Sequence, residues 1–323
     1  MAGWNWSGKK VIVTGGAGFV GGVLCDKLRG RGCRDIFIPV RRDFDLTNES
    51  AVDRMYRAAF DGAPPDVVIH LAAEVGGIGA NRENPGRFCF ANMAMGMNLI
   101  EGARRIGMPA AGGKFVLTGT ICSYPKFTPV PFNEDNLWNG YPEETNAPYG
   151  IAKKAVGEML RAYHAQYRLR GAYVLPVNLY GPRDDFDPLN SHVIPALIRK
   201  FYEAKRDGIS FIECWGTGSA SREFLYVDDA AEGILRAAEV MDEPIPINLG
   251  TGMEITIRDL VQLIARLSDF TGDIRWDPTK PDGQPRRCLD TSRARTLLGW
   301  QARVGFEEGL RRTIDWYAAN PQP

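Results

Sequence analysis

Val11-Ile12-Val13-Thr14-Gly15-Gly16-Ala17-Gly18-Phe19-Val20-Gly21 is the stretch that decides the fold of this 323-residue chain. It begins with a short apolar run typical of a strand, and apolar residues then recur at helical spacing as far as Leu28. Strand, glycine turn and helix in this order are the context that a dinucleotide fingerprint requires. The glycines permit a tight turn, close approach to a pyrophosphate and close helix–strand packing, with the helix N-terminus facing the phosphates. We therefore predict a dinucleotide site here rather than a plain tight turn.

Two arginines follow the second predicted strand. Asp35–Val40 has the apolar character of a strand, and Arg41-Arg42 comes directly after it. An NAD site usually has an acidic residue at this point to hold the ribose 2′-hydroxyl, whereas an NADP site has arginine for the 2′-phosphate. The sequence therefore favours NADP over NAD. A solvated arginine pair, with Asp43 close by, is the alternative, and the Michaelis constants for NADPH and NADH distinguish the two.

Strand-like and helical stretches alternate through the first half of the chain. The strand-like runs are 67–70, 114–118 and 172–178, and the helical stretches are 48–60, 87–106 and 149–168. This alternation predicts an α/β fold with a doubly wound parallel sheet of the Rossmann type. Ligands of such sheets bind beyond the carboxyl ends of the strands.

The composition of the sequence changes after Gly181. Pro, Asp and Asn cluster in 181–190, and loop-rich segments recur at 215–222 and 277–287. We expect residues 1–180 to form the dinucleotide-binding domain, with 224–250 returning to it. Residues 181–223 and 251–323 then form most of a second, smaller substrate domain. A helix beginning at Thr256, where Asp259 completes a capping box, is expected to be structural.

Composition excludes several classes of protein. The formal net charge is zero, so nothing indicates a nucleic-acid or anionic-membrane partner. No apolar run approaches the ~20 residues of a membrane span, and the N-terminus lacks the apolar core of a signal peptide. The six cysteines are scattered, without a Cys-x-x-Cys pair or a histidine cluster, which argues against a metal site and a disulfide framework. A cytoplasmic metabolic enzyme acting on a small molecule fits this composition.

Tyr149 and Lys153 are the first candidates for chemistry. Four residues apart, they share one face of a helix, so the phenol and the ammonium can converge on one point. A neighbouring cation favours the phenolate and would lower the pKa of the phenol from its usual value. Thr120, just after a predicted strand, adds a hydroxyl that could bind a substrate carbonyl. Together these three suit hydride transfer between a nicotinamide and a carbonyl, during which the oxygen gains or loses a proton.

Several motifs resemble a known family. The glycine loop, Leu71-Ala72-Ala73, Tyr149-x-x-x-Lys153 and Asn178-Leu179-Tyr180-Gly181-Pro182 resemble the extended short-chain dehydrogenase/reductase superfamily. Further segments resemble one family within it, GDP-L-fucose synthase. They are Val75-Gly76-Gly77-Ile78, Cys122-Ser123-Tyr124-Pro125-Lys126, Thr145-Asn146-Ala147-Pro148, Asn190-Ser191-His192-Val193-Ile194-Pro195, Trp215-Gly216-Thr217-Gly218, Arg222-Glu223-Phe224 and Lys280-Pro281-Asp282-Gly283. The similarity covers nearly the whole chain in the expected order.

The resemblance implies a reaction and a set of residues that carry it. The family converts GDP-4-keto-6-deoxy-D-mannose to GDP-L-fucose by epimerisation at C3 and C5, followed by reduction of the C4 ketone by NADPH. Carried over to this chain, Cys122 and His192 are the base and acid of epimerisation, beside Thr120, Tyr149 and Lys153. Homodimerisation through the helices at 87–106 and 149–168 is expected on the resemblance alone.

The resemblance also implies two sets of binding residues. The substrate set comprises Lys200, Trp215, Arg222 and Asp282. The cofactor set comprises Gly15, Gly16, Ala17, Gly18, Phe19, Val20, Gly21, Arg41, Arg42, Asp45, Leu46, Leu71, Ala72, Ala73, Thr118, Lys153, Pro176, Val177, Asn178, Leu179 and His192.

The chain departs from the family pattern around the acid/base cysteine. Threonine at 120 replaces the commoner serine, and Ile121 and Ser123 exchange the usual polar and apolar neighbours of Cys122. Pro142-Glu143-Glu144 also differs from the family pattern. An epimerase-only or 4-ketoreductase-only enzyme acting on another GDP-4-keto sugar is therefore the alternative. A cofactor-sensing protein on the same fold is a third reading, but such proteins typically lose the Tyr/Lys pair.

Overall fold

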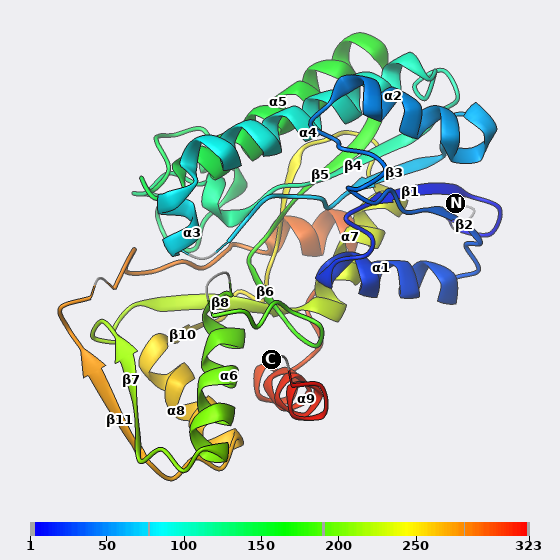
Figure 1. Ribbon diagram of the computed structural model, residues 1–323. Coiled ribbons are helices and arrows are strands. Elements are labelled where there is room, and N and C mark those ends of the chain that lie inside the picture. Colours follow the sequence, from blue (N-terminus) through cyan, green and yellow to red (C-terminus); the bar gives the residue numbers. More distant parts are fainter. Residues whose placement is uncertain (1–3, 77, 189–190, 281, 322–323) are drawn as a thin grey trace.

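The fold is built on a six-stranded parallel sheet, shown in the computed structural model in Figure 1. The strand order is β2-β1-β3-β4-β5-β9. The strands are β1 (Lys10–Thr14), β2 (Asp35–Phe37), β3 (Val67–His70), β4 (Lys114–Thr118), β5 (Arg170–Pro176) and β9 (Pro246–Leu249). All neighbouring strands run parallel, and the chain winds outward from β1 in both directions. The predicted doubly wound α/β fold is thereby confirmed.

Helices cover both faces of this sheet. In Figure 1, α2 (Glu49–Ala58), α4 (Pro85–Arg105) and α5 (Ala147–Tyr167) lie above the sheet, with α1 (Phe19–Gly30) and α7 (Val227–Val240) below it. Strands β1, β3 and β4 are almost wholly buried between them, which is why they appear in the sequence as continuous apolar runs.

Two predicted elements end earlier than expected. The helix expected over 48–60 ends at Ala58, because Phe60 and Asp61 adopt positive φ angles of 52° and 54°. The strand expected over 35–40 ends at Phe37. Pro39 lies just beyond it, and proline has no N–H to continue a ladder of hydrogen bonds.

A second group of elements packs around its own core. A three-stranded sheet contains β6 (Asn178–Tyr180), β8 (Ser221–Tyr226) and β10 (Glu254–Thr256), and a two-stranded sheet contains β7 (Phe211–Trp215) and β11 (Asp273–Asp277). Helices α6 (Val193–Arg206), α8 (Ile257–Leu267) and α9 (Phe306–Ala319) complete it. Thr256 caps α8 as expected, accepting a hydrogen bond from the Asp259 backbone N–H at 3.0 Å. This group lies in the lower part of Figure 1, below the carboxyl ends of the large sheet.

Packing links the two groups more closely than a simple boundary suggests. Leu289, Leu298 and Trp300 belong to the core of the large sheet, although they follow the elements of the smaller group in sequence. Tyr180, Phe224 and α9 residues share the second core. The exact domain boundaries stay a prediction.

The structure describes residues 4–76, 78–188, 191–280 and 282–321. The motif residues Gly77, Asn190 and Pro281 lie outside these ranges. In the described ranges, no helix combines the length and the apolar character that crossing a membrane requires.

Candidate active site

The carboxyl ends of the parallel strands meet at one edge of the sheet. Thr14 is the register partner of His70, and Pro176 is the partner of Leu249. The Thr14 hydroxyl lies 2.8 Å from His70 Nδ1 and so ties the ends of β1 and β3 together. Burial lowers the pKa of His70 well below its usual value, and the nearby Lys153 cation acts in the same direction. A neutral, hydrogen-bonded His70 therefore has a structural role at this edge of the sheet.

The glycine loop packs against neighbouring backbone at the start of α1. A Cβ atom added to Gly15 would lie 2.8 Å from the Ala72 nitrogen, and one added to Gly21 would lie 2.6 Å from Gly16 Cα. No side chain caps α1 at Gly18, and its first turn has no acidic residue. The N–H groups of this turn are therefore free to bind an anion, and only glycine allows the backbone to pack so closely. These features fit a dinucleotide pyrophosphate.

Other predicted cofactor residues surround the loop. Thr118 Oγ1 is buried at the end of β4 without a hydrogen-bond partner among the residues described, so it can bind a ligand group. Arg41 lies four residues beyond the end of β2, where its side chain is exposed and forms an ion pair with Glu74 at 3.0 Å. Glu74 also pairs with Arg87 at 2.7 Å. Arg42 is more exposed and pairs with Asp43 at 3.1 Å.

Tyr149 and Lys153 lie on the buried side of α5. Their exposed fractions are 8% and 2%. Desolvation lowers the pKa of Lys153 to about 8, and the described part of the chain provides no hydrogen-bond or ion-pair partner for its ammonium. The expected lowering of the Tyr149 pKa by this cation is wrong for the protein alone. Burial raises the pKa of Tyr149, and the adjacent Cys122 adds to the rise.

Cys122 is brought to Tyr149 by a short 3-10 helix, η2 (Ile121–Ser123), packed on α5. Thr120 begins this turn, and its hydroxyl oxygen accepts a hydrogen bond from the Cys122 N–H at 3.1 Å. The hydroxyl proton of Thr120 thus remains available to donate to a substrate. Ser123 Oγ donates to the Gly150 carbonyl at 2.9 Å. Gly150 permits this packing, because an added Cβ would lie 2.8 Å from the Cys122 carbonyl carbon and closer still to its oxygen.

His192 lies at the start of α6, across from the Tyr149 helix in the chain's other group of elements. Its side chain reaches solvent, yet the surrounding protein desolvates the ring and lowers its pKa, an effect that Asp185 opposes. Within the described ranges, no hydrogen bond joins His192 to Cys122 or Tyr149. The structure therefore places the two predicted partners of epimerisation on separate elements.

The predicted substrate residues gather around β7 and β8. Lys200 donates to the carbonyl of Glu213, which lies in β7. Trp215, at the end of β7, is 68% exposed, and Lys280 lies 5.6 Å above its ring. Asp282 accepts two hydrogen bonds from Thr217, each 2.7 Å long.

Arg222 connects this group to the cysteine. It donates to the carbonyl oxygens of Ser221 and Gln284 at 2.7 and 2.6 Å. Burial lowers the pKa of Arg222 to about 10, the Arg287 cation adds to the lowering, and Cys122 opposes it. The guanidinium still carries its charge at neutral pH, so an anionic ligand can bind here.

Comparison with known proteins agrees with this geometry. The NAD dependent epimerase/dehydratase family matches residues 11–250. GDP-L-fucose synthase 1 of Arabidopsis thaliana is 39% identical over 311 residues, covering 96% of this chain and 94% of that protein. The chain belongs to the NAD dependent epimerase/dehydratase family, in its GDP-L-fucose synthase branch.

Two solved structures extend the comparison. A GDP-L-fucose synthetase from Naegleria fowleri bound to NADP has a TM-score of 0.85 and 26% identity, covering 97% of this chain and 95% of that one. A GDP-mannoheptose C4 reductase from Campylobacter jejuni with NADP bound has a TM-score of 0.86 and 26% identity, covering 98% and 100%. A GDP-L-fucose synthetase and a GDP-mannoheptose C4 reductase thus share this architecture.

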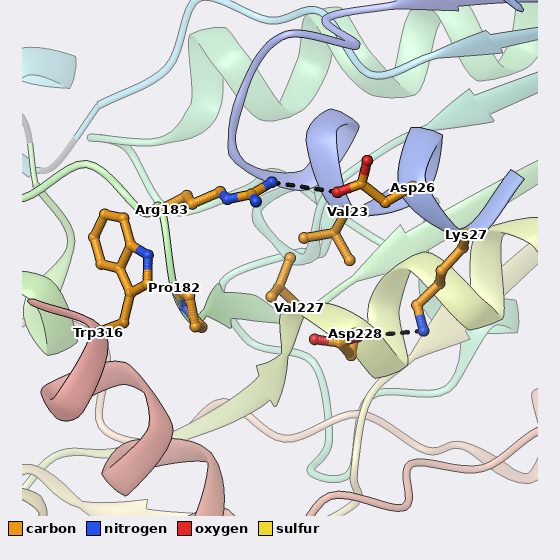
Figure 2. Close-up of a pocket in the computed structure, with 8 residues that line it drawn as sticks. All are labelled: Val23, Asp26, Lys27, Pro182, Arg183, Val227, Asp228 and Trp316. Atoms are coloured by element: carbon orange, nitrogen blue, oxygen red, sulfur yellow. Dashed lines mark hydrogen bonds and ion pairs between the residues drawn. The ribbon is translucent and has the colours of Figure 1, made fainter. Parts of the chain in front are cut away.

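A separate groove of about 440 Å³ lies away from these family residues (Figure 2). It is lined by Val23, Asp26, Lys27, Pro182, Arg183, Val227, Asp228 and Trp316. Its charges pair across the groove, with Arg183 3.3 Å from Asp26 and Lys27 3.3 Å from Asp228. None of the predicted catalytic or binding residues lines it, so we do not assign the reaction to this groove.

Sequence reasoning missed two residues that contact Cys122, the cysteine predicted to take part in epimerisation. Gly150 lies inside the Tyr149-x-x-x-Lys153 motif, and its lack of a side chain was the available signal. Arg287 Nη1 lies 3.8 Å from the Cys122 sulfur. Its only sequence signal was a basic pair in a loop-rich segment, which does not indicate a partner 165 residues away.

Proposed function

We propose that this enzyme converts GDP-4-keto-6-deoxy-D-mannose to GDP-L-fucose, epimerising C3 and C5 and then reducing the C4 ketone with NADPH. The observation that carries the proposal is the packing of η2 on α5, which brings Cys122 to the helix that carries Tyr149 and Lys153. Membership of the GDP-L-fucose synthase branch supports the same reaction.

Epimerisation uses the acidity of carbons next to a ketone. The Cys122 thiolate removes the proton from C3 or C5, and the electron pair of that C–H bond moves onto the ketone oxygen as an enolate. Hydroxyl donors at that oxygen, Thr120 and Tyr149, stabilise the developing charge. Return of a proton to the opposite face, from His192 once it has taken a proton from solvent, completes each inversion.

Reduction uses the same oxygen site with the opposite electron flow. NADPH supplies a hydride to C4 when bound. Tyr149 donates its phenolic proton to the C4 oxygen, so the ketone becomes an alcohol and a phenolate remains. The Lys153 ammonium, buried one helical turn away, stabilises that phenolate. Solvent then restores the phenolic proton.

The residues present fit NADP as the cofactor. The uncapped start of α1 suits the pyrophosphate, and the arginines after β2 suit the 2′-phosphate. The NADP-bound Naegleria fowleri and Campylobacter jejuni structures share the fold. Leu71, Ala72 and Pro176–Leu179 line the adjoining strand ends and complete the proposed site.

The cationic side chains of Lys200 and Arg222 suit the diphosphate of a nucleotide sugar. Trp215, with its exposed ring, suits a base or sugar face, and the Asp282 carboxylate suits hydroxyl groups. These four residues are proposed as the GDP-sugar site, with the sugar directed toward Cys122.

Cellular location and assembly are parts of the same proposal. All six cysteines are unpaired, as a cytoplasmic enzyme requires. Phe90 and Met97, seven residues apart on one face of α4, are 66% and 44% exposed. We propose that this face forms a homodimer contact, and that substituting Glu for either residue shifts the mass measured by light scattering to that of a monomer.

The deciding experiment follows solvent deuterium. The enzyme is incubated with GDP-4-keto-6-deoxy-D-mannose in deuterated water, with and without NADPH, and read by proton NMR. Deuterium at C3 and C5, followed by GDP-L-fucose once NADPH is present, supports the proposal. Reduction without exchange indicates instead a 4-ketoreductase, like the Campylobacter jejuni relative, and exchange without reduction indicates an epimerase.

Two variants test the division of roles. Tyr149→Phe is expected to abolish reduction and leave some exchange, because it removes the proton donor but not the base. Cys122→Ala is expected to abolish exchange. Cys89→Ala, at a half-buried cysteine on α4, is the matched control and should behave as wild type. Exchange at the wild-type rate in Cys122→Ala would show that another group is the base.

A further inference from the structure

The Cys122 sulfur lies beside a cation that the proposed reaction has not yet used. Arg287 Nη1 lies 3.8 Å from Cys122 Sγ, within the distance of a hydrogen bond to sulfur. The same cysteine lies near Tyr149, since it contributes to the raised pKa of that phenol, and near Arg222, whose pKa it also influences. Of these neighbours, Arg287 is the one that contacts the sulfur.

The backbone on both sides of Arg287 is held at three points. The Pro285 carbonyl accepts from the Ser221 N–H at 2.8 Å, and the Cys288 carbonyl accepts from the Phe132 N–H at 2.7 Å. The Leu289 N–H donates to the buried Glu223 carboxylate at 2.6 Å. These bonds fix a segment that would otherwise be a surface loop, so the position of the guanidinium is set by the fold.

The guanidinium itself is oriented by its neighbours. Arg287 Nε donates to Gln284 Oε1 at 2.7 Å, and Gln284 Nε2 donates in turn to the Lys126 carbonyl at 2.8 Å. Burial alone would raise the pKa of Glu143, but hydrogen bonds from Thr145 and the nearby Arg287 cation lower it overall. The Gln284 amide thus orients the planar fork, while Nη1 contacts the Cys122 sulfur.

We propose that Arg287 is a positioning residue for proton abstraction, which holds Cys122 as a thiolate aimed at the sugar ring. This inference deepens the proposed function and rests on it. The thiol releases its proton to solvent, and the guanidinium stabilises the remaining anion through a charge-assisted hydrogen bond. The thiolate then takes the substrate proton and becomes a thiol, which returns a proton to solvent when the cycle ends.

The chemistry explains why a fixed arginine is needed here. A thiolate is the reactive form of cysteine, and a nearby cation increases its share at neutral pH. Arginine cannot compete for the substrate proton, because its guanidinium stays charged throughout. Lysine at the same place would keep the charge but lose the planar fork that Gln284 holds.

The test measures the thiol without any substrate. Iodoacetamide modification of Cys122 is followed by peptide mass spectrometry from pH 6 to 10, in wild type, Arg287→Gln and Arg287→Lys. Arg286→Gln is the matched control, because Arg286 is an exposed neighbour paired with Glu254 instead. We expect modification of Arg287→Gln at pH 7 to be slower by about tenfold, with its pH profile moved to higher pH. Arg287→Lys should recover most of the rate, and Arg286→Gln all of it.

Deuterium exchange and NADPH binding complete the test. Exchange at C3 and C5 should fall by about tenfold or more in Arg287→Gln, while NADPH affinity stays unchanged. A wild-type modification profile in Arg287→Gln overturns the inference, as does failure of Arg287→Lys to recover reactivity when both variants are folded by circular dichroism. If wild type shows the Arg287-dependent thiol but no exchange with substrate, the proposed function fails while the thiolate pairing stands. The two failures are therefore distinguishable.

Discussion

Gly150→Ala is predicted to damage catalysis far more than stability. Gly150 is on the face of α5 that contacts η2, next to Tyr149. An added Cβ would lie 2.8 Å from the Cys122 carbonyl carbon. Carbon atoms that pack without strain are about 3.5–4.0 Å apart, so Cys122 must retreat from α5 by about 0.7 Å or more.

The two effects on stability largely cancel. Alanine in place of glycine within a helix gains about 1 kcal/mol in propensity. Overpacking of this kind costs about 1–3 kcal/mol. The net loss of about 0–2 kcal/mol leaves the protein folded, because domains typically have about 5–15 kcal/mol of stability. Displacing a reacting group by about 1 Å, however, can cost about 10²-fold in rate. We therefore expect a loss of deuterium exchange approaching 10²-fold in a folded enzyme.

The assay compares exchange rates and denaturant midpoints of Gly150→Ala with those of Gly86→Ala. Gly86 is also helical, in α4, but an added Cβ there has nothing within 4 Å. The control should keep full activity and equal or greater stability. Wild-type exchange in Gly150→Ala would refute the argument that the contact between η2 and α5 sets the position of Cys122.

Three further predictions concern charges. Lys153→Met should raise the free energy of unfolding at pH 7 by up to about 3 kcal/mol and abolish reduction. Folding lowers the pKa of Lys153 to about 8, and each pKa unit corresponds to about 1.4 kcal/mol that the buried ammonium costs the folded protein. Between the folded-state pKa of Lys153 and its ordinary value of about 10.5, the unfolded chain binds more protons than the folded one, so wild-type stability rises with pH. The stability gap between Lys153→Met and wild type should therefore shrink as pH rises through that range. A gap in urea titrations that does not change with pH would contradict this. Arg41→Ala should raise the Michaelis constant for NADPH about tenfold and leave that for NADH unchanged. Equal changes in the two Michaelis constants would show that Arg41 does not bind the 2′-phosphate. Glu223→Gln should lower the free energy of unfolding by about 2–3 kcal/mol, as measured by urea denaturation. The buried Glu223 carboxylate accepts hydrogen bonds from the backbone N–H groups of Thr251, Gly252 and Leu289. An unchanged urea midpoint would show that stability does not depend on these bonds.

Short-range patterns predicted the large sheet well. The apolar runs at 67–70 and 114–118 became β3 and β4 with the predicted bounds, because strands buried on both faces leave a continuous signal. The glycine loop was equally readable, since strand, turn and helix lie within one segment. Predicted boundaries were wrong where the backbone leaves regular structure, as in the helix predicted over 48–60, within which Phe60 has a positive φ of 52°.

Contacts between distant segments could not be predicted in this way. Arg287 reaches Cys122 because bonds from β8 residues Ser221 and Glu223, and from Phe132, hold its segment in place. Each of these bonds joins parts of the chain that share no sequence pattern. The pKa of Tyr149 likewise depends on three-dimensional burial, and the four-residue spacing to Lys153 gave the wrong direction for the protein alone.

The raised pKa of Tyr149, opposite to the predicted direction, helps to assign the chemistry. Pairs of titratable groups whose surroundings favour opposite protonation states mark the acid and the base of a site. Burial raises the pKa of Tyr149, so the phenol stays protonated at neutral pH and is ready to donate to the ketone oxygen. Arg287 Nη1 contacts the Cys122 sulfur at 3.8 Å, and we propose that this cation stabilises the anion that accepts a proton. In this proposal Tyr149 donates protons and Cys122 accepts them. An enzyme that first removes and then adds protons around one ketone needs both states together, and this arrangement provides them before substrate binds.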